Sequence, residues 1–438
     1  MKKWGLLLGF QLTLQISYAQ QQWSLQQCIE YAKNNNTAVL NRELDLEVEY
    51  LKQRNIRKQR LPSVNSFVNT ASSFGQDQDI FGNTQRNDNL NSAFGVTFEI
   101  NLNTYGRIGK ETKKSILDIE VANRNKEIEK RGLIELIIID YLDILVKQEM
   151  VKLYELNIER LNVEHKNIKL GVELGKFSKS TELDSYADII SKKQDFEQTK
   201  VDLRLAKLNL LTALELESDV SMELDKMLIS DESLKLHFNK EEMVGSDMLR
   251  LNPNLDRLRI IGKALESQSE VLKSQLYPTL TLGSTFGTMF YNSYVFQSQI
   301  ISEQLKRNFY QQLFFRFSIP IYDKSSIKNA VAQNSLMIEQ ISNNLKAENI
   351  KQKNKIENLL INWKTNYEKY HSNIEVSDIL KESLKNAEHN FRNGKGTFYE
   401  LNEVRSKYFL AKSEEIKSKY NCYFQKCLIH NFLGSQIN

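Results

Sequence analysis

The sequence predicts a mainly α-helical protein with a small β part, built as two tandem structural repeats. Breakers are rare, with 4 Pro and 17 Gly in 438 residues, which favours long uninterrupted helices. Two proline-free stretches, 106–174 and 324–393, carry apolar residues at helical spacing. A helix of either length would span on the order of 100 Å, far beyond an ordinary globular helix. Each stretch follows a pair of alternating segments, so the order helix, strand, strand, long helix, helix occurs twice.

Residues 1–19 have the pattern of a secretory signal peptide. Lys2 and Lys3 precede an apolar run, and Ser17 and Ala19 are small residues at −3 and −1 of a cleavage site before Gln20. An N-terminal anchor helix is the alternative, but the apolar run is too short to span a membrane well. No lipid-attachment cysteine follows the predicted cut, so we expect an exported chain without an acyl group.

The first repeat is predicted to cover 20–216. Ser24 is the expected N-cap of a short helix, and a second helix ends near Leu61 and Pro62. Its strands are expected at about 63–74 and 93–102, a polar loop at 76–91, and a helical hairpin at 106–216. Gly175 suits the left-handed C-cap of the long helix, and Ser180 or Thr181 is the expected cap of the returning helix.

The second repeat is predicted to cover 250–438, after an acidic connecting (equatorial) segment at 217–249. Its strands are expected at about 279–290 and 312–321, a polar and aromatic loop at 292–308, and a helical hairpin at 324–434. The spacing between corresponding elements is about 216 to 219 residues throughout, which indicates an internal repeat.

Composition and motifs argue against several classes of function. The net charge is +4 without a concentrated basic patch, so nucleic acid is not an expected partner. Cys28, Cys422 and Cys427 are an odd number and are interpreted as small apolar packing residues. The five histidines are isolated, and no metal spacing, phosphate loop or nucleophile elbow is present. We therefore expect no catalytic residues, no cofactor, no metal and no enzyme activity.

The predicted strands have one apolar and one polar face. In the second strand Phe94, Val96 and Phe98 alternate with small and polar residues, and each strand is about long enough to cross a bilayer. Such a strand suits a soluble sheet on a core or a barrel in lipid, and we favour the transmembrane β part. Four strands do not close a barrel, and lipid tolerates no open edge. Copies of the chain must then share one barrel, of eight strands from two copies or twelve from three.

The segment 133–139 is apolar nearly all round. It is too short, and too close to Asp140 and Asp143, for a transmembrane helix. A helix with neighbours on both sides would have this pattern, and so would a locally buried core helix.

Taken together, the chain resembles a TolC-type outer-membrane efflux protein (outer-membrane factor) over essentially its whole mature length. The resemblance rests on the predicted export signal before Trp23-Ser24-Leu25-Gln26-Gln27-Cys28-Ile29, the breaks Leu61-Pro62 and Tyr277-Pro278, the strand end Phe98-x-Ile100-x-Leu102 before Tyr105-Gly106-Arg107, and the glycines of the two tips. Two local departures occur: Asn101-Leu102-Asn103 and Pro320-Ile321-Tyr322 stand where the family often has Pro-Leu-Phe, and Asp323-Lys324-Ser325 replaces a Gly-rich turn.

The resemblance implies a homotrimer with a shared twelve-stranded β-barrel and a trimeric α-barrel tunnel. It further implies the outer membrane of a Gram-negative bacterium, with a periplasmic extension and contact with outer-membrane lipid. A periplasmic adaptor (membrane fusion protein) and an inner-membrane pump would complete the conduit. The expected function is a passive export duct from periplasm to exterior, within a tripartite efflux or type I secretion system.

The hairpin tips are the expected sites of contact with the adaptor. The resemblance points to Gly175, Lys176, Phe177 and Ser178 in the first tip, and to Gly394, Lys395, Gly396 and Thr397 in the second. A turn that merely needs glycine is the alternative, and it explains Gly175 and Gly394 alone.

Glu400 and Glu403 are the expected acidic ring of the periplasmic entrance. They lie three residues apart on one helical face, at positions where the family has aspartates that line this constriction. Repeated by symmetry, the two carboxylates would attract cations. An ordinary solvated helix face is the alternative. Glu182 corresponds to them less well in the first repeat, because it is displaced by one residue.

A periplasmic helical-hairpin adaptor or scaffold is the main alternative function. Adaptors also carry export signals and long hairpins, but they usually have one hairpin inserted in a β-rich sandwich. This chain has two hairpins, each preceded by a pair of amphipathic strands. A secreted enzyme is a third possibility that no constellation of residues supports.

Overall fold

The structure is a computed structural model that describes residues 22–78, 81–218, 222–225, 227, 229–236, 252–293 and 300–435. The predicted signal peptide 1–19 and much of the connecting segment 217–249 lie outside the described residues. The helices are α1 (Leu25–Asn35), α2 (Thr37–Lys58), α3 (Arg107–Glu173), α4 (Lys179–Leu214), α5 (Asp231–Leu234), α8 (Pro253–Ser274), α9 (Ile301–Arg307), α10 (Ser326–Arg392) and α11 (Phe398–Leu433). The strands are β1 (Gln22–Trp23), β2 (Ser63–Ser73), β3 (Gln76–Gln78), β4 (Thr84–Arg86), β5 (Asn89–Asn103), β6 (Glu223–Leu224), β7 (Thr279–Ser293) and β8 (Tyr310–Ser318).

Corresponding helices in the two halves of the sequence have equal lengths. The helices α3 and α10 each have 67 residues, and α4 and α11 each have 36. The helix α10 begins at Ser326, 219 residues after Arg107 of α3, and α11 follows α4 at the same spacing. The boundaries of the two repeats stay a prediction. By its contacts the chain divides differently, into a first compact unit (Met1–Leu40, Ile128–Asn252, Gln352–Asn438) and a second (Asn41–Glu127, Pro253–Lys351).

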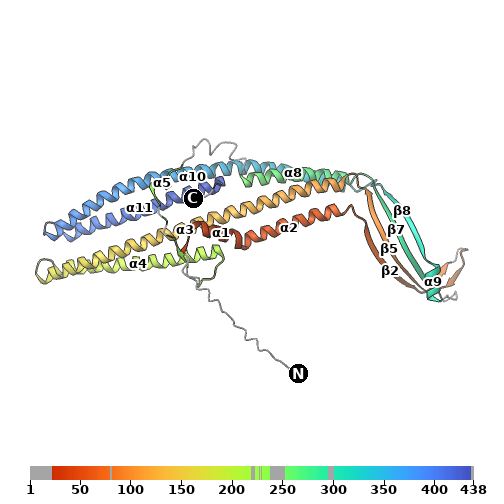
Figure 1. The fold of residues 1–438 in the computed structure, drawn as a ribbon, viewed down its shortest axis with the longest axis horizontal. Helices are drawn as coiled ribbons and strands as arrows, with labels where there is room; N and C mark the ends of the chain where they lie inside the picture. Colours follow the sequence, from red (N-terminus) through yellow and green to blue (C-terminus); the bar gives the residue numbers. More distant parts are fainter. Residues whose placement is uncertain are drawn as a thin grey trace, which may run out of the picture. The chain divides into compact units, whose positions relative to one another are not determined.

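The second unit contains a four-stranded antiparallel sheet in the order β2-β5-β7-β8 (Figure 1). The register pairs Ser63 with Glu99 and Thr279 with Ser318, so the strand ends joined to the long helices lie at one end of the sheet. The helices α2, α3, α8 and α10 all meet the sheet at that end (Figure 1). Both outer strands, β2 and β8, have one side without a partner strand among the described residues.

Each face of this sheet has its own chemistry. The register places apolar residues together on one face: Val64 and Val68 of β2, Phe94, Val96, Phe98 and Ile100 of β5, Leu280, Leu282, Phe286 and Phe290 of β7, and Leu313, Phe315 and Phe317 of β8. The other face is rich in Ser, Asn, Thr and Gly, and it carries Glu99 and Arg316, which lie 3.9 Å apart. Three rings on this face lie over glycines, such as Phe67 over Gly95 and Phe314 over Gly283. This face therefore combines small polar side chains with three aromatic rings that cover its glycines.

The strands differ from their expected bounds for local reasons. The strand β8 ends at Ser318 because Pro320 has no N–H to donate to the ladder. The first expected loop contains a short hairpin, β3 with β4. The second contains α9, where the Gln304 side chain bonds both the N–H and the C=O of Tyr291, as a paired strand would. The spacing of apolar residues along the sequence does not predict these hydrogen bonds of the Gln304 side chain.

The first unit is organised around one large hydrophobic core. Ile137, Ile138 and Tyr141 of α3 are fully buried there, together with side chains from α1, α4, α10 and α11. The hydroxyl of Tyr141 donates to the carbonyls of Trp23 and Asp225, and so joins the short parallel pair β1 and β6 to α3.

The three cysteines belong to this core. All are buried and free, as expected of packing residues, and burial raises the pKa of each thiol to about 12. Thiols with such a pKa stay protonated at neutral pH and are therefore poor nucleophiles.

No helix within the described part of the chain combines the length and the apolarity that a membrane-spanning helix needs.

Candidate functional site at the hairpin tips

The first tip joins α3 to α4, and its turn is made by the backbone. Gly175 has φ +72°, the left-handed conformation that glycine adopts without a steric penalty. The N–H of Lys176 donates to the carbonyl of Gly171 (2.7 Å), and the N–H of Gly175 to that of Val172 (3.0 Å). These two bonds form a Schellman motif, which satisfies carbonyls that the end of α3 would otherwise leave free.

The cap of α4 differs from the expected one. Ser178, not Ser180 or Thr181, is the N-cap, because α4 begins at Lys179. Its hydroxyl accepts from the N–H of Thr181 at 3.1 Å. Of the predicted adaptor contacts in this tip, Gly175, Lys176 and Ser178 are exposed, and Phe177 is half-buried.

The second tip joins α10 to α11 and repeats the same turn. Gly394 has φ +71°, and the N–H of Lys395 donates to the carbonyl of Asn390 at 2.9 Å. The cap is more complete than in the first tip. Thr397 accepts from the N–H of Glu400 (3.2 Å), and Glu400 accepts in return from the N–H of Thr397 (2.9 Å), which is a capping box.

The capping box changes the interpretation of the two predicted entrance carboxylates. Glu400 stabilises the start of α11, a role that the sequence analysis did not assign to it. Glu403 forms an exposed ion pair with Lys407 of the same helix at 2.6 Å. Each carboxylate therefore has a partner within its own chain. In the first hairpin, Glu182 pairs with Lys179 at 2.7 Å, and this hydrogen bond holds the pKa of Glu182 below its ordinary value.

Phe177 connects the first tip to the second hairpin. Its ring stacks on Phe391 of α10, with 4.9 Å between centroids and planes 10° apart. It packs against a small core of Ile168, Leu384, Phe391 and Leu401, which draws on both hairpins. Gly171 makes room for the ring, since a Cβ there would lie 2.3 Å from it.

A buried arginine that the sequence analysis missed joins the hairpins below the tips. Arg405 of α11 is only 3% exposed and forms ion pairs with Glu164 of α3 and Asp188 of α4. Leu401, Arg405 and Phe409 are all buried at a spacing of four residues. An arginine within an apolar stripe of a helix was the signal in the sequence that could have revealed this network.

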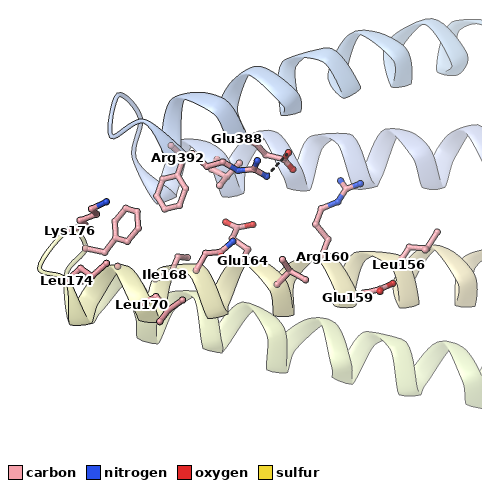
Figure 2. A pocket seen from close by; sticks show the side chains of 16 residues that line it. Leu156, Glu159, Arg160, Glu164, Ile168, Leu170, Leu174, Lys176, Glu388 and Arg392 are labelled. Carbon is pink, nitrogen blue, oxygen red and sulfur yellow. Dashed lines mark ion pairs between the residues drawn. The ribbon is translucent and has the colours of Figure 1, made fainter.

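A groove lies between the hairpins beside the tips, with a volume of about 690 Å³. Its floor is apolar, from Ile168, Phe391 and Leu401. Charged side chains form its rim, and Figure 2 shows Glu159 and Arg160 on one hairpin and Glu388, paired with Arg392, on the other. An apolar floor with charges of both signs at the rim suits a helical protein segment.

The described part of the chain holds no group of three or more metal-ligating side chains.

Comparisons with known proteins were informative at the level of structure. No family model matches the sequence, and no curated protein is significantly similar to it. The structure is similar to that of CusC, a protein that forms a transmembrane channel. The TM-score is 0.80 and the identity 14%, and the match covers 94% of this chain and 92% of CusC. It is also similar to the CmeC outer-membrane channel of Campylobacter jejuni, with TM-score 0.80, 13% identity, and coverage of 94% and 85%. The outer-membrane protein VceC of Vibrio cholerae gives TM-score 0.78, 10% identity, and coverage of 94% and 97%.

These matches define the class of fold. The chain has the fold of outer-membrane channels that combine an α-helical barrel with a β-barrel, and the resemblance inferred from the sequence is confirmed for the fold.

Proposed function

We propose that the protein is an outer-membrane channel that serves as a passive export duct, from periplasm to exterior, in a tripartite efflux or type I secretion system. The observation that carries this proposal is the sheet of the second unit, which has one apolar face, one polar face and two unpaired outer edges among the described residues. The similar structures include outer-membrane channels, which supports the same reading.

The apolar face of the sheet is exposed in the single chain. Val68, Leu313 and Phe315 are each between 65% and 68% exposed in the single chain. A soluble sheet would cover such residues with a core, whereas a barrel exposes them to lipid. The edges of β2 and β8 would then pair with copies of the chain, because unpaired backbone groups in lipid cost several kcal/mol each.

The polar face of the sheet supports three copies rather than two. It carries mostly small polar side chains, and its three aromatic rings lie over glycines, which suits a lumen wider than the side-chain-filled interior of an eight-stranded barrel. Three copies with twelve strands supply such a lumen, so we propose a homotrimer in the outer membrane of a Gram-negative bacterium.

The helices also leave apolar stripes uncovered in a single chain. On α2 the stripe is Leu40, Leu44, Val48 and Leu51, and on α4 it includes Leu183, Tyr186 and Ile190. Residues at this spacing share one helix face. Neighbouring protomers in an α-barrel would bury both stripes, which agrees with the proposed trimer.

The tips and the groove beside them are the proposed contacts for a periplasmic adaptor, which would link the channel to an inner-membrane pump. Both tips are accessible, because Gly175, Lys176 and Ser178 of the first and Gly394, Lys395 and Thr397 of the second are exposed. Glu400 and Glu403 are proposed to face the periplasmic entrance as an acidic ring, with Glu403 the stronger candidate because Glu400 also caps its helix.

Membrane fractionation followed by planar-bilayer recording tests the channel. We expect the protein in the outer-membrane fraction, as an SDS-resistant trimer, and stable single-channel conductance after reconstitution. A monomer in the aqueous fraction after cell lysis would contradict the proposal and favour an adaptor or scaffold.

The acidic ring is tested by block with divalent cations in the same recordings. Glu400→Gln together with Glu403→Gln removes both charges, while glutamine still accepts the capping bond from Thr397. We expect weaker cation block than in the wild type. The control is Thr397→Ala, which breaks the cap and keeps both carboxylates; unchanged block in the double variant would remove this assignment.

A further inference from the structure

Basic residues gather where the long helices meet the sheet. We define this basic collar as residues 54–60, 105–114, 270–277 and 322–328. Together these four ranges contain eleven Lys and Arg against three Asp and Glu, a formal charge of +8, whereas the whole chain carries +4. The rest of the chain is therefore net acidic by four charges, so the positive charge is concentrated at one end of the sheet.

The four ranges adjoin one another within the second unit. They belong to the ends of α2, α3, α8 and α10 that meet the sheet at the same end (Figure 1). Tyr105, before α3, stacks on Tyr277, after α8, with 3.6 Å between ring centroids. Lys113 of α3 approaches Glu270 of α8 at 4.0 Å. These contacts join two of the four ranges directly, and the sheet register brings all four to the same end of the sheet.

Most of its cations have no carboxylate partner. Arg107 pairs with Glu111 and Lys114 with Asp118, both within α3. Lys113 has the 4.0 Å contact with Glu270 described above. The other eight cations of the collar form no ion pair with any described residue, and all are exposed except the half-buried Lys110. They are Arg54, Arg57, Lys58, Arg60, Lys110, Lys273, Lys324 and Lys328.

Exposed tyrosines accompany these cations. Tyr105 is 48% exposed, Tyr277 40% and Tyr322 81%. A tyrosine ring has an apolar body and a polar hydroxyl, and it is enriched where a bilayer meets water. The apolar face of the sheet begins directly beyond them, at residues such as Leu280 and Phe317.

We propose that the basic collar binds the phosphate groups of anionic phospholipids in the bilayer leaflet that faces the long helices. This inference rests on the proposed function, since it takes the sheet to be embedded in lipid. Basic residues next to a membrane-spanning segment attract anionic lipid, and the attraction falls off within a Debye length.

The test uses the full-length protein reconstituted in vesicles, with spin-labelled phosphatidylglycerol or phosphatidylcholine as the probe. The spectra give the relative association of each lipid with the protein surface. A basic residue at a membrane surface adds about a fivefold preference for anionic lipid at low salt, so we expect at least that preference for phosphatidylglycerol. Raising the salt from about 0.05 M to about 0.5 M should reduce it several-fold.

The collar variant replaces Arg57, Lys58, Arg60, Lys273 and Lys324 by glutamine. The matched control replaces five exposed lysines of the first unit, Lys166, Lys169, Lys193, Lys369 and Lys381, in the same way. We expect the collar variant to lose the preference for phosphatidylglycerol and the control to keep it.

Equal association of the two lipids with the wild type, or a preference that survives in the collar variant, would overturn the proposal. Conductance is recorded from the same vesicles. A conducting protein without lipid preference contradicts the collar alone, whereas a protein that does not enter the bilayer contradicts the channel itself. If the collar variant does not assemble, the salt dependence of the wild type tests the proposal. A preference for phosphatidylglycerol that does not fall at high salt would overturn it.

Discussion

At the first tip Gly175 has φ +72°, at the second Gly394 has φ +71°, and in both a following lysine donates to the carbonyl five residues back. The side chains then differ. The first tip places Phe177 where the second has Gly396, and the second completes a capping box that the first lacks. The first tip thus places a turn residue against the other hairpin, whereas the second has the more complete helix cap.

This difference concerns how each tip is held rather than how exposed it is. Gly175, Lys176 and Ser178 are exposed, as are Gly394, Lys395 and Thr397, while Phe177 and Gly396 are half-buried. The two tips therefore share one turn and one pattern of exposure, and they differ in whether the half-buried position carries a side chain that packs.

The largest effect is expected from the buried ion pairs that join the hairpins. Arg405→Ala leaves Glu164 and Asp188 without their buried cation, and such a loss costs about 3 kcal/mol. Chemical denaturation of the purified protein in detergent measures it. The control is Arg392→Ala, whose ion pair is exposed and long at 4.0 Å, with little expected change. If Arg405→Ala and Arg392→Ala lower the free energy of unfolding by similar amounts, the buried ion pairs are not the stronger contribution.

Phe177→Ala should be the next most costly change, at about 2 kcal/mol, because a half-buried aromatic contact is lost. The same denaturation experiment detects it. Tyr399→Ala at the start of α11 is the control, since that side chain is 77% exposed and its removal should be neutral. If both variants lose the same stability, the packing of Phe177 does not stabilise the protein.

Gly175→Ala and Gly394→Ala should each cost about 1 kcal/mol, because both glycines have positive φ and Ala is strained there. Equal losses at the two tips would show that the backbone turn is the shared feature. Gly132→Ala within α3 is the control, where an added Cβ meets open space and Ala should stabilise the helix by up to about 1 kcal/mol. If Gly132→Ala lowered the free energy of unfolding as much as the tip variants do, positive φ would not be the cause of the loss at the tips.

The smallest effect concerns pH. The hydrogen bond from Lys179 holds the pKa of Glu182 below its ordinary value, so the folded state favours the carboxylate. Its contribution is present above the ordinary pKa of glutamate and is lost as the pH falls through the depressed pKa. Glu182→Gln should therefore lower Tm slightly at neutral pH and not at strongly acidic pH. A pH-independent difference would show that another contact is responsible.

Much of the helical architecture could be predicted from local patterns. Gly175 and Gly394 were predicted to end long helices, and Leu61-Pro62 and Tyr277-Pro278 to stand between helix and strand, because such signals act over a few residues. The N-cap of α4 was misplaced by two residues or more, since Ser178, Ser180 and Thr181 are all good caps.

The candidate site was harder to predict, because its contacts join residues far apart in the chain. The stacking of Phe177 on Phe391 and the pairing of Arg405 with Glu164 span more than 200 residues. Phe177 was predicted as a site residue from its position in the tip, whereas Arg405 was not predicted. Glu400 was named for its charge, but its hydrogen bonds assign it a capping role.

By itself, the sequence determined the element order, the punctuation of the helices and the two-faced character of the strands, since these depend on neighbouring residues and on period. Only the tertiary structure decided which cations share the collar, which arginine is buried and which ring Phe177 stacks on. Those features arise from packing between distant segments, where burial and distance, rather than spacing along the chain, determine the energy of each contact.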